Sequence, residues 1–305
     1  MKTPLEKSIP LSEELQSNVY MKLENFQNSG SFKPRGGFNK IIKFSEHQPG
    51  NTFVAPTAGG HGVGLSYAGQ ILGAKVHIMM PKSADPERIK VIEQYGATIS
   101  YYASVPEARE AAHAAANEQN TIFVSAYNDL EMIEGGGTIA LEMLSQIASI
   151  DCLVCGVGGG GYISGMAAML KSVNPQIEIV GVQQENAPLI YNWFKTGVYE
   201  ITSTKPSIAE GVGATIEEDS ITFPLMREYV DDFVLVSENE IADAVKWMME
   251  HHKHYVEPSG VVGLAALKKY PSKFRQYSNI ATVITGRNIS YNLLMTILTG
   301  QTSHH

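Results

Sequence analysis

The sequence predicts an α/β fold in which parallel β-sheets are covered by helices on both faces. Short apolar segments, typical of buried strands, alternate with Ala-rich segments of helical periodicity, and Gly or Pro stands at the joints between them. This alternation is typical of chains whose successive strands run in the same direction and are connected by helices. With 305 residues, the chain is long enough for one large domain or two ordinary ones.

Four strands and three helices are expected between residues 52 and 125. The apolar segment 52–56 ends in a glycine-rich turn, after which the helix 61–72 begins. Pro81 ends the next strand, 75–80, and Pro86 opens the helix 87–95. The rest of this region is expected to form strand 98–102, helix 106–118 and strand 121–125. After the midpoint, the same alternation predicts strand 150–155, helix 162–173, strand 177–182, helix 238–253 and strand 280–285.

Composition and charge narrow the class of protein. Lys and Arg number 23 against 31 Asp and Glu, which gives a net charge of -8 and argues against nucleic acid as the main partner. No apolar run approaches the roughly 20 residues of a membrane span, and residues 1–7 lack the apolar core of a secretion signal. Only two cysteines occur, which favours a reducing compartment. We therefore expect a soluble cytoplasmic enzyme that acts on a small molecule and binds no membrane.

A run of glycines joins the expected strand 150–155 to the helix 162–173. Gly158, Gly159, Gly160 and Gly161 leave the backbone amides unshielded, and the helix adds the positive end of its dipole, so the loop suits a phosphate. The loop lacks the Gly-Lys-Ser/Thr of a P-loop and the acidic residue of a dinucleotide site. A flexible turn is the alternative, although one or two glycines would suffice for it.

Three further segments carry chemistry. Ser29 to Gly37 places Lys33 among small residues at the expected start of a helix, where the helix dipole and burial would lower the pKa of its amine. A neutral lysine amine can form a Schiff base, and a surface lysine is the alternative. Thr57 to Gly62 joins a strand to a helix and suits a carboxylate, and Thr285 to Asn288 follows a late strand. Because active sites of parallel sheets lie beyond the carboxyl ends of strands, these segments can share one cleft.

A phosphate loop, a carboxylate loop and one special lysine together indicate an amino acid that meets a phosphorylated aldehyde. The chain resembles the fold-type II pyridoxal-phosphate enzymes, and within them the serine/threonine dehydratase (ammonia-lyase) and serine racemase family. The resemblance covers nearly the whole chain, because these segments occur in the family's order: Thr3–Leu5, Val19–Asn25, Ser29–Gly36, the glycine loop and Val256–Gly260. It implies a fold like that of tryptophan synthase β-subunits, with two open, twisted, mainly parallel sheets flanked by helices. It also implies a large cofactor-binding domain of residues 1–51 and 130–305, a small domain of residues 52–129, and a homodimer.

The resemblance assigns roles to the motif residues. Lys33 would hold pyridoxal 5'-phosphate as a Schiff base and act as the base at the substrate α-carbon. Phe32 would lie against the pyridine ring and Thr285 would hydrogen-bond its nitrogen, which favours loss of a β-leaving group because a hydroxyl leaves that nitrogen largely unprotonated. The remaining roles are phosphate binding by Gly158, Gly159, Gly160 and Gly161, and binding of the substrate carboxylate by the amides of Thr57, Ala58, Gly59 and His61.

Two positions depart from the family's pattern. Gly60 stands where the family usually has Asn, which hydrogen-bonds the phenolic oxygen of the cofactor, and Arg287 stands where it usually has Gly. We assign both positions to the surroundings of the cofactor, with Arg287 as a cation near its ring. Similar segments occur in tryptophan synthase β-subunits, but the catalytic glutamate of those proteins would fall on Ala55, so indole condensation is not expected.

The resemblance favours elimination over racemisation. The family's racemases use, as an acid on the second face of the substrate, a serine that aligns with Ala58, whose methyl group carries no proton. We therefore expect a lyase that removes the β-hydroxyl of an amino acid of the L-threonine or L-serine type and yields a 2-oxo acid and ammonia. The alternatives are β-replacement or racemisation through the same Lys33, and a homologue that binds the cofactor without turnover.

Cysteines and histidines outside these motifs receive structural interpretations. Cys152 and Cys155 lie three apart on a strand and should point to opposite faces, so we expect them to pack in the core rather than bind zinc. His251, His252 and His254 are expected to cap helix carbonyls or to face solvent.

Two glutamates and one histidine complete the candidates. Glu210 precedes Gly211 in a segment similar to one near which family members bind a cation, which implies Mg²⁺ or another cation there, or a plain hinge residue. Glu257 is expected to order the cofactor site without transferring protons. His61 is expected to shape its turn rather than to act as an acid or base.

Overall fold

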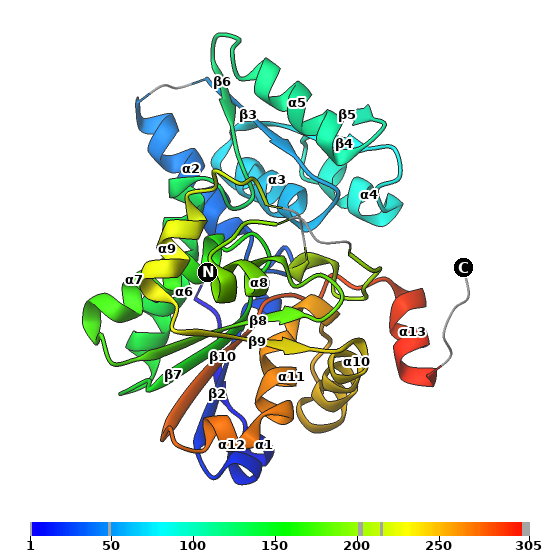
Figure 1. Ribbon diagram of the computed structural model, residues 1–305. Coiled ribbons are helices and arrows are strands. Elements are labelled where there is room, and N and C mark those ends of the chain that lie inside the picture. Colours follow the sequence, from blue (N-terminus) through cyan, green and yellow to red (C-terminus); the bar gives the residue numbers. More distant parts are fainter. Residues whose placement is uncertain (1, 48–49, 201–203, 214–215, 301–305) are drawn as a thin grey trace.

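The computed structural model describes residues 2–47, 50–200, 204–213 and 216–300, and these form two β-sheets flanked by helices (Figure 1). The larger sheet has the strand order β1-β2-β10-β7-β8-β9, and the smaller has the order β5-β4-β3-β6. β1 runs antiparallel to β2, and the other neighbouring strands are parallel. The predicted α/β class with two mainly parallel sheets is confirmed. The strands are β1 (Leu5–Lys7), β2 (Asn18–Leu23), β3 (Thr52–Pro56), β4 (Lys75–Pro81), β5 (Thr98–Tyr102), β6 (Thr121–Phe123), β7 (Cys152–Gly156), β8 (Glu178–Gln184), β9 (Asp232–Val236) and β10 (Asn279–Ile284).

Several helices begin after a residue whose side chain caps them. Ser8, Ser104, Asp129 and Ser290 each accept a hydrogen bond from a backbone N–H of the first turn, and Ser237 forms a capping box with Glu240. The helices are α1 (Ile9–Leu15), α2 (Pro34–His47), α3 (Gly60–Leu72), α4 (Pro86–Gln94), α5 (Val105–Ala115), α6 (Leu130–Gln146), α7 (Gly161–Val173), α8 (Leu189–Thr196), α9 (Thr222–Tyr229), α10 (Glu238–Trp247), α11 (Val262–Lys269), α12 (Pro271–Phe274) and α13 (Tyr291–Thr299).

The predicted strands and helices are present, with two instructive differences at their ends. β6 ends two residues before the expected end at Ser125, because the Ser125 hydroxyl accepts hydrogen bonds from the amides of Tyr127 and Asn128 and turns the chain. The segment 238–253 is α-helical only to Trp247. It continues as a π-helical turn, Met248–His252, which ends at Lys253 in the left-handed conformation.

β7 lies inside the larger sheet and is buried on both faces. Its residues alternate between two apolar cores, because Cys152 and Val154 belong to one and Leu153 and Cys155 to the other. The two cysteines therefore point to opposite faces, as predicted, and burial raises the pKa of both free thiols. These thiols serve as core side chains.

The smaller sheet lies within residues 52–123, in the upper half of Figure 1. Phe53 and Ala55 pack in the core that α3 and α4 share, whereas Val54 packs against α5 on the other face. The division into domains of residues 52–129 and of residues 1–51 plus 130–305 follows the boundary between the two sheets and stays a prediction. Within the described part of the chain, no helix is both long enough and apolar enough to cross a bilayer.

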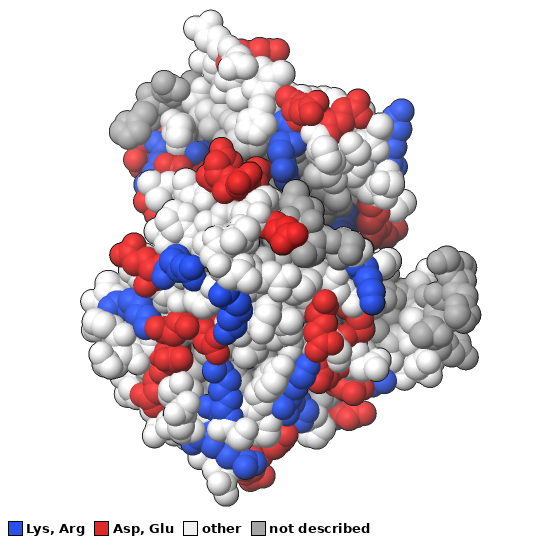
Figure 2. Space-filling view, in the orientation of Figure 1, with Lys and Arg blue, Asp and Glu red and all other residues white. Residues whose placement is uncertain are grey.

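Charged side chains of both signs are mixed over the surface. On the face shown in Figure 2, Lys and Arg lie between Asp and Glu over both halves of the molecule. The described residues of this face therefore form no continuous basic surface that would attract a polyanion.

Candidate active site

Three neighbouring strands of the larger sheet end at the predicted motifs. β2 ends at Leu23 before the Lys33 segment, β10 ends at Ile284 before Thr285, and β7 ends at Gly156 before the glycine loop. In the sheet, β10 lies between β2 and β7 and is parallel to both. Because parallel strands have their carboxyl ends at one edge of the sheet, the three motifs meet there.

Backbone hydrogen bonds join the Lys33 segment to the end of β10. The amide of Phe32 donates to the carbonyl of Thr285 at 3.1 Å, and the amide of Arg287 donates to the carbonyl of Gly30 at 2.8 Å. The amide of Thr285 donates to the carbonyl of Gly260 at 3.2 Å, which brings the Glu257 segment to the same place. Residues more than 250 positions apart, such as Phe32 and Thr285, are thus fixed beside one another.

Lys33 stands immediately before α2 and close to α3. A Cβ atom on Gly64 of α3 would lie 2.5 Å from the Cβ of Lys33, so only a glycine permits this approach. Burial lowers the pKa of the Lys33 amine to about 8, although the nearby carboxylate of Glu257 raises it. Burial likewise raises the pKa of Glu257 to about 7, against the effects of Arg88 and Lys33. Both groups therefore exchange protons near neutral pH.

The helix that follows Lys33 is anchored by a buried charge network. Arg35 donates from Nε and Nη2 to the two carboxylate oxygens of Glu24 at 2.7 Å, and from Nη1 and Nη2 to Glu142 at 2.9 Å. Lys22, which is fully buried, reaches the same Glu142 at 2.6 Å. These paired bonds fix α2 against α6 and β2, and therefore fix the position of Lys33.

The glycine loop packs so closely against its neighbours that side chains on its glycines would collide with them. Gly160 has a φ of 83°, in the left-handed region, and begins the turn into α7. A Cβ on Gly158 would lie 2.2 Å from the carbonyl oxygen of Gly211, and one on Gly159 would lie 2.1 Å from Cγ of Tyr127. The loop is closely packed and stands at the start of α7, where backbone amides and the helix dipole suit a phosphate.

The second predicted loop, Thr57 to His61, lies between β3 and α3. The Thr57 hydroxyl accepts a hydrogen bond from the amide of Gly59 at 3.0 Å and so orders the turn. A Cβ on Gly59 would lie 2.5 Å from Nη1 of Arg88, whereas one on Gly60 would meet no atom of the described residues within 4 Å. The position that departs from the family's pattern thus leaves open space.

His61 is buried beside Lys33. Its Nε2 lies 3.3 Å from the carbonyl oxygen of Val124, and its Nδ1 has no hydrogen-bond partner among the residues that the structure describes. Burial, and then the charge of Lys33, lower the pKa of His61 to about 3. The ring is therefore neutral, and Nδ1 is an unused acceptor in the site.

The side chains of Arg287 and Glu210 have protein partners of their own. The Arg287 guanidinium donates to the carbonyl oxygen of Asn25. The side chain of Glu210 is 77% exposed, and its carboxylate lies 3.8 Å from Nη1 of Arg88. The roles of these two residues toward a cofactor and a cation stay predictions.

Arg88 and Tyr127 border the site and are absent from the sequence prediction. Arg88 lies against Gly59, and Tyr127 lies against Gly159 and Gly161. Arg88 follows the end of β4 and Tyr127 the end of β6, both in the smaller sheet. The rule that active-site residues follow the carboxyl ends of strands, applied to every strand, would have found them.

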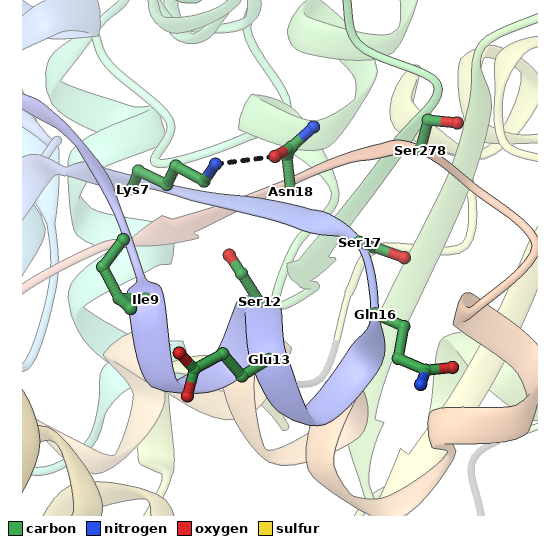
Figure 3. A pocket seen from close by; sticks show the side chains of 8 residues that line it. All are labelled: Lys7, Ile9, Ser12, Glu13, Gln16, Ser17, Asn18 and Ser278. Atoms are coloured by element: carbon green, nitrogen blue, oxygen red, sulfur yellow. Dashed lines mark hydrogen bonds between the residues drawn. The ribbon is translucent and has the colours of Figure 1, made fainter.

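A depression elsewhere on the surface is not part of this site. It is lined by residues between Lys7 and Asn18 and by Ser278 (Figure 3). Asn18 begins β2, and Ser278 precedes β10, so this depression lies at the amino ends of the strands. The Lys33 site lies at their carboxyl ends.

The residues present suit pyridoxal phosphate, because an amine with a lowered pKa, a glycine cradle and a buried unpaired acceptor occur together.

Comparison with known proteins leads to the same cofactor. Residues 1–286 match the family described as pyridoxal-phosphate dependent enzyme. The L-threonine ammonia-lyase of Thermotoga maritima is 38% identical over 299 residues, 97% of this chain and 74% of that protein. The serine racemase of Dictyostelium discoideum is 33% identical and covers 97% of this chain and 92% of its own. The structure of processed threonine deaminase isoform 2 from Solanum lycopersicum is similar, with a TM-score of 0.90 at 28% identity, over 99% of this chain and 88% of that one. The chain belongs to the pyridoxal-phosphate dependent enzymes.

Proposed function

We propose that the protein is an ammonia-lyase that converts a β-hydroxy amino acid of the L-threonine or L-serine type into a 2-oxo acid and ammonia. The observation that carries the proposal is the Lys33 amine, whose pKa is about 8 and which stands where three parallel strands end. Relatives named L-threonine ammonia-lyase and threonine deaminase support the substrate class. The hydroxyl leaves as water and a later hydrolysis takes water up, so the net change is the loss of ammonia.

We assign cofactor binding to residues on several elements. When bound, pyridoxal phosphate supplies an electron-withdrawing ring that stabilises negative charge at the substrate α-carbon. The amides of Gly158 to Gly161 would hold its phosphate, and the Thr285 hydroxyl would face the ring nitrogen. The ring of Phe32, whose centroid lies 4.8 Å from Nζ of Lys33, would lie against the cofactor. The ring of Tyr162 packs against the ring of Phe32, with the two centroids 4.8 Å apart.

Lys33 is the proposed base at the α-carbon. An amine with a pKa of about 8 is partly neutral at the pH of a cell and can accept a proton. Glu257 keeps the pKa from falling further, so the amine can also hold the proton until it is released. The neutral ring of His61 adds no charge that would compete.

The loop before α3 is the proposed site of the substrate carboxylate. The amides of Thr57 to His61 lie at the positive end of the α3 dipole, which favours an anion. The guanidinium of Arg88 lies beside Gly59 and adds positive charge there. The two features would orient the substrate so that its α-proton faces Lys33.

Ala58 favours elimination over racemisation. It is exposed in this loop, and its methyl group has no proton to give to the second face of the substrate. Racemisation is the second candidate because a relative that is 33% identical is named a serine racemase. The two reactions differ in product, so one assay separates them.

The test uses purified holoenzyme with L-threonine and L-serine. We expect 2-oxo acid and ammonia in equal amounts, and no product from a Lys33→Ala variant that still binds the cofactor. Chiral analysis of the remaining substrate measures racemisation, and added thiols or amines reveal β-replacement. Absence of 2-oxo acid from a panel of β-hydroxy amino acids would refute the proposal.

We also propose a cytoplasmic homodimer. Tyr291, Met295 and Leu298 lie at helical spacing on α13 and are exposed, which suits an apolar contact between two copies of the chain. The two free, buried cysteines suit a reducing compartment. Sedimentation of the wild type and of Tyr291→Glu tests the dimer, and a monomeric wild type would contradict it.

A cation at Glu210 is a separate proposal. The exposed carboxylate has room for a hydrated Mg²⁺, but Arg88 at 3.8 Å competes with it. Activity that depends on added Mg²⁺ in the wild type and not in Glu210→Gln would support this role. Equal activity with and without the ion would contradict it.

A further inference from the structure

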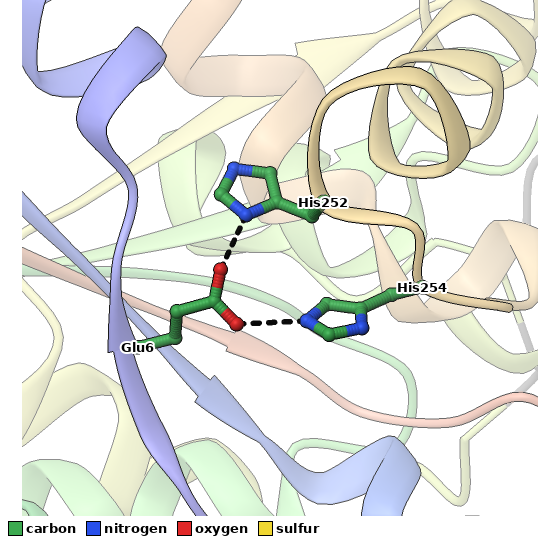
Figure 4. A group of neighbouring side chains, drawn as sticks. All are labelled: Glu6, His252 and His254. Atoms are coloured by element: carbon green, nitrogen blue, oxygen red, sulfur yellow. Dashed lines mark hydrogen bonds and ion pairs between the residues drawn. The ribbon is translucent and has the colours of Figure 1, made fainter.

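Two histidines and a glutamate converge at the edge of the larger sheet. One carboxylate oxygen of Glu6 on β1 lies 2.5 Å from Nδ1 of His252, and the other lies 2.8 Å from Nε2 of His254 (Figure 4). We call Glu6, His252 and His254 the His–Glu cluster. Among the described residues, this is the one group of three such side chains whose potential metal-ligand atoms all lie within 4.8 Å of one another.

The backbone takes two uncommon conformations at this place. α10 continues after Trp247 as a π-helical turn, and Lys253 then has a φ of 59°, in the left-handed region. Such turns occur often at functional sites, and a non-glycine residue in this region is uncommon. In a regular helix, His252 and His254 would lie on opposite sides, because successive residues are about 100° apart. Here both rings point at one carboxylate.

The hydroxyl group of Ser8 hydrogen-bonds the ring nitrogen of His252 that faces away from Glu6. Nε2 of His252 lies 2.9 Å from the oxygen of Ser8, which is itself fixed because it accepts a hydrogen bond from the amide of Leu11. Histidines that bind metals usually donate their other ring N–H to an oxygen. When Nε2 donates to Ser8, Nδ1 directs its lone pair at a carboxylate oxygen of Glu6, which also carries lone pairs. At 2.5 Å a shared proton satisfies both atoms, and a metal ion that displaces this proton and binds both atoms would satisfy them as well.

We propose that the His–Glu cluster binds one divalent transition-metal ion, and that Zn²⁺ fits best. Two imidazole nitrogens and one carboxylate oxygen form a three-ligand zinc set, in which water takes the fourth position. Mg²⁺ fits poorly because it prefers oxygen ligands. Zinc distances of about 2.0–2.2 Å place tetrahedral ligand atoms roughly 3.3 Å apart, so the Glu6 oxygens must move away from the two ring nitrogens when the ion enters. The Glu6 side chain is 35% exposed, against 5% and 14% for the histidines, so the carboxylate can move and solvent can reach the ion.

The ion would connect β1 to the segment that leads into the active site. His254 lies three residues before Glu257, and its ring packs edge-on against Phe26 at 5.1 Å. The side-chain Nδ2 of Asn25 donates to the backbone carbonyl of Tyr255 at 3.3 Å, so this segment also touches the residues that lead to Lys33. We therefore assign the ion a structural role, in which it fixes the chain before Glu257.

The test is a zinc titration of chelator-treated holoenzyme against a coloured indicator, followed by dialysis and metal analysis. The wild type is expected to retain one more Zn²⁺ per chain than Glu6→Gln or His254→Ala. Loss of a residue that hydrogen-bonds a metal ligand usually weakens metal binding about 10- to 100-fold. We expect a loss of zinc affinity of this size in Ser8→Ala and a larger loss in Glu6→Gln and His254→Ala. His251→Ala is the matched control, because the Nδ1 of His251 faces the carbonyl of Trp247 at 3.1 Å instead of Glu6.

Each variant is checked for folding by circular dichroism and by cofactor absorbance. Glu6→Gln keeps the size of the side chain, so it tests the carboxylate even if a histidine variant fails to fold. All variants keep His304 and His305, whose zinc binding is then common to all. The proposal is overturned if the wild type and Glu6→Gln bind equal zinc with equal affinity, or if His251→Ala loses the ion.

Discussion

The glycine cradle makes the sharpest prediction, for the substitution Gly159→Ala. The added Cβ would lie 2.1 Å from Cγ and 2.3 Å from Cδ1 of Tyr127. Restoring an ordinary carbon contact of about 3.5 Å requires a shift of more than about 1 Å. Such a shift takes a loop amide out of hydrogen-bond range of a phosphate oxygen. Loss of one bond to a charged group, about 1.5–3 kcal/mol, would weaken cofactor binding roughly 10- to 150-fold.

The assay is a titration of cofactor-free protein with pyridoxal phosphate, followed by absorbance. Tyr127→Ala removes the obstructing ring atoms, so the double variant should recover part of the affinity. Wild-type affinity in Gly159→Ala, or no recovery of affinity in the double variant, would refute the reasoning.

Three further outcomes are expected. Arg35→Met should lower the free energy of unfolding by about 3–5 kcal/mol in urea denaturation, because it leaves the buried carboxylate of Glu24 without its cation; a change near zero would contradict this. The turnover rate should rise with pH as the Lys33 amine loses its proton and should level off above about 8, whereas a flat profile would argue against Lys33 as the base. Ala58→Ser should add racemisation, detected by chiral chromatography, because it places a hydroxyl on the second face; unchanged enantiomeric purity would speak against that placement.

Local sequence predicts a helix or strand well when its residues favour that structure by themselves. The residues of α6 do not. Gly135, Gly136 and Gly137 stand in its middle and lower its helical propensity. The structure shows why they are there: a Cβ on Gly136 would lie 2.6 Å from Cα of Tyr162, and one on Gly165 of α7 would lie 2.0 Å from the carbonyl oxygen of Ile133. Close packing of α6 on α7 overrides propensity, and no short window of sequence contains that contact.

The active-site motifs are predictable from sequence because each directly follows a strand or begins a helix. The His–Glu cluster is not, because it depends on a contact between residues 246 and 248 positions apart. The prediction that all three histidines cap carbonyls or face solvent is confirmed for His251, which contacts the carbonyl of Trp247. It is wrong for His252 and His254, because the π-helical turn redirects both rings to Glu6.

In this site, the groups proposed to bind anions differ from the groups proposed to exchange protons. Burial brings Lys33 and Glu257 to pKa values of about 8 and 7 and holds His61 neutral, so the titratable groups carry little net charge near neutral pH. Anionic groups are therefore met by the amides of the glycine loop and of the start of α3, whose partial charges do not titrate, and by the guanidinium of Arg88 beside Gly59. In Lys33→Ala, which cannot form the Schiff base, cofactor affinity should then change little between about pH 6.5 and 8.5, where the turnover of the wild type changes steeply. If the affinity of this variant and the turnover of the wild type fell together as the pH is lowered, loss of the cofactor, and not protonation of Lys33, would explain the activity profile.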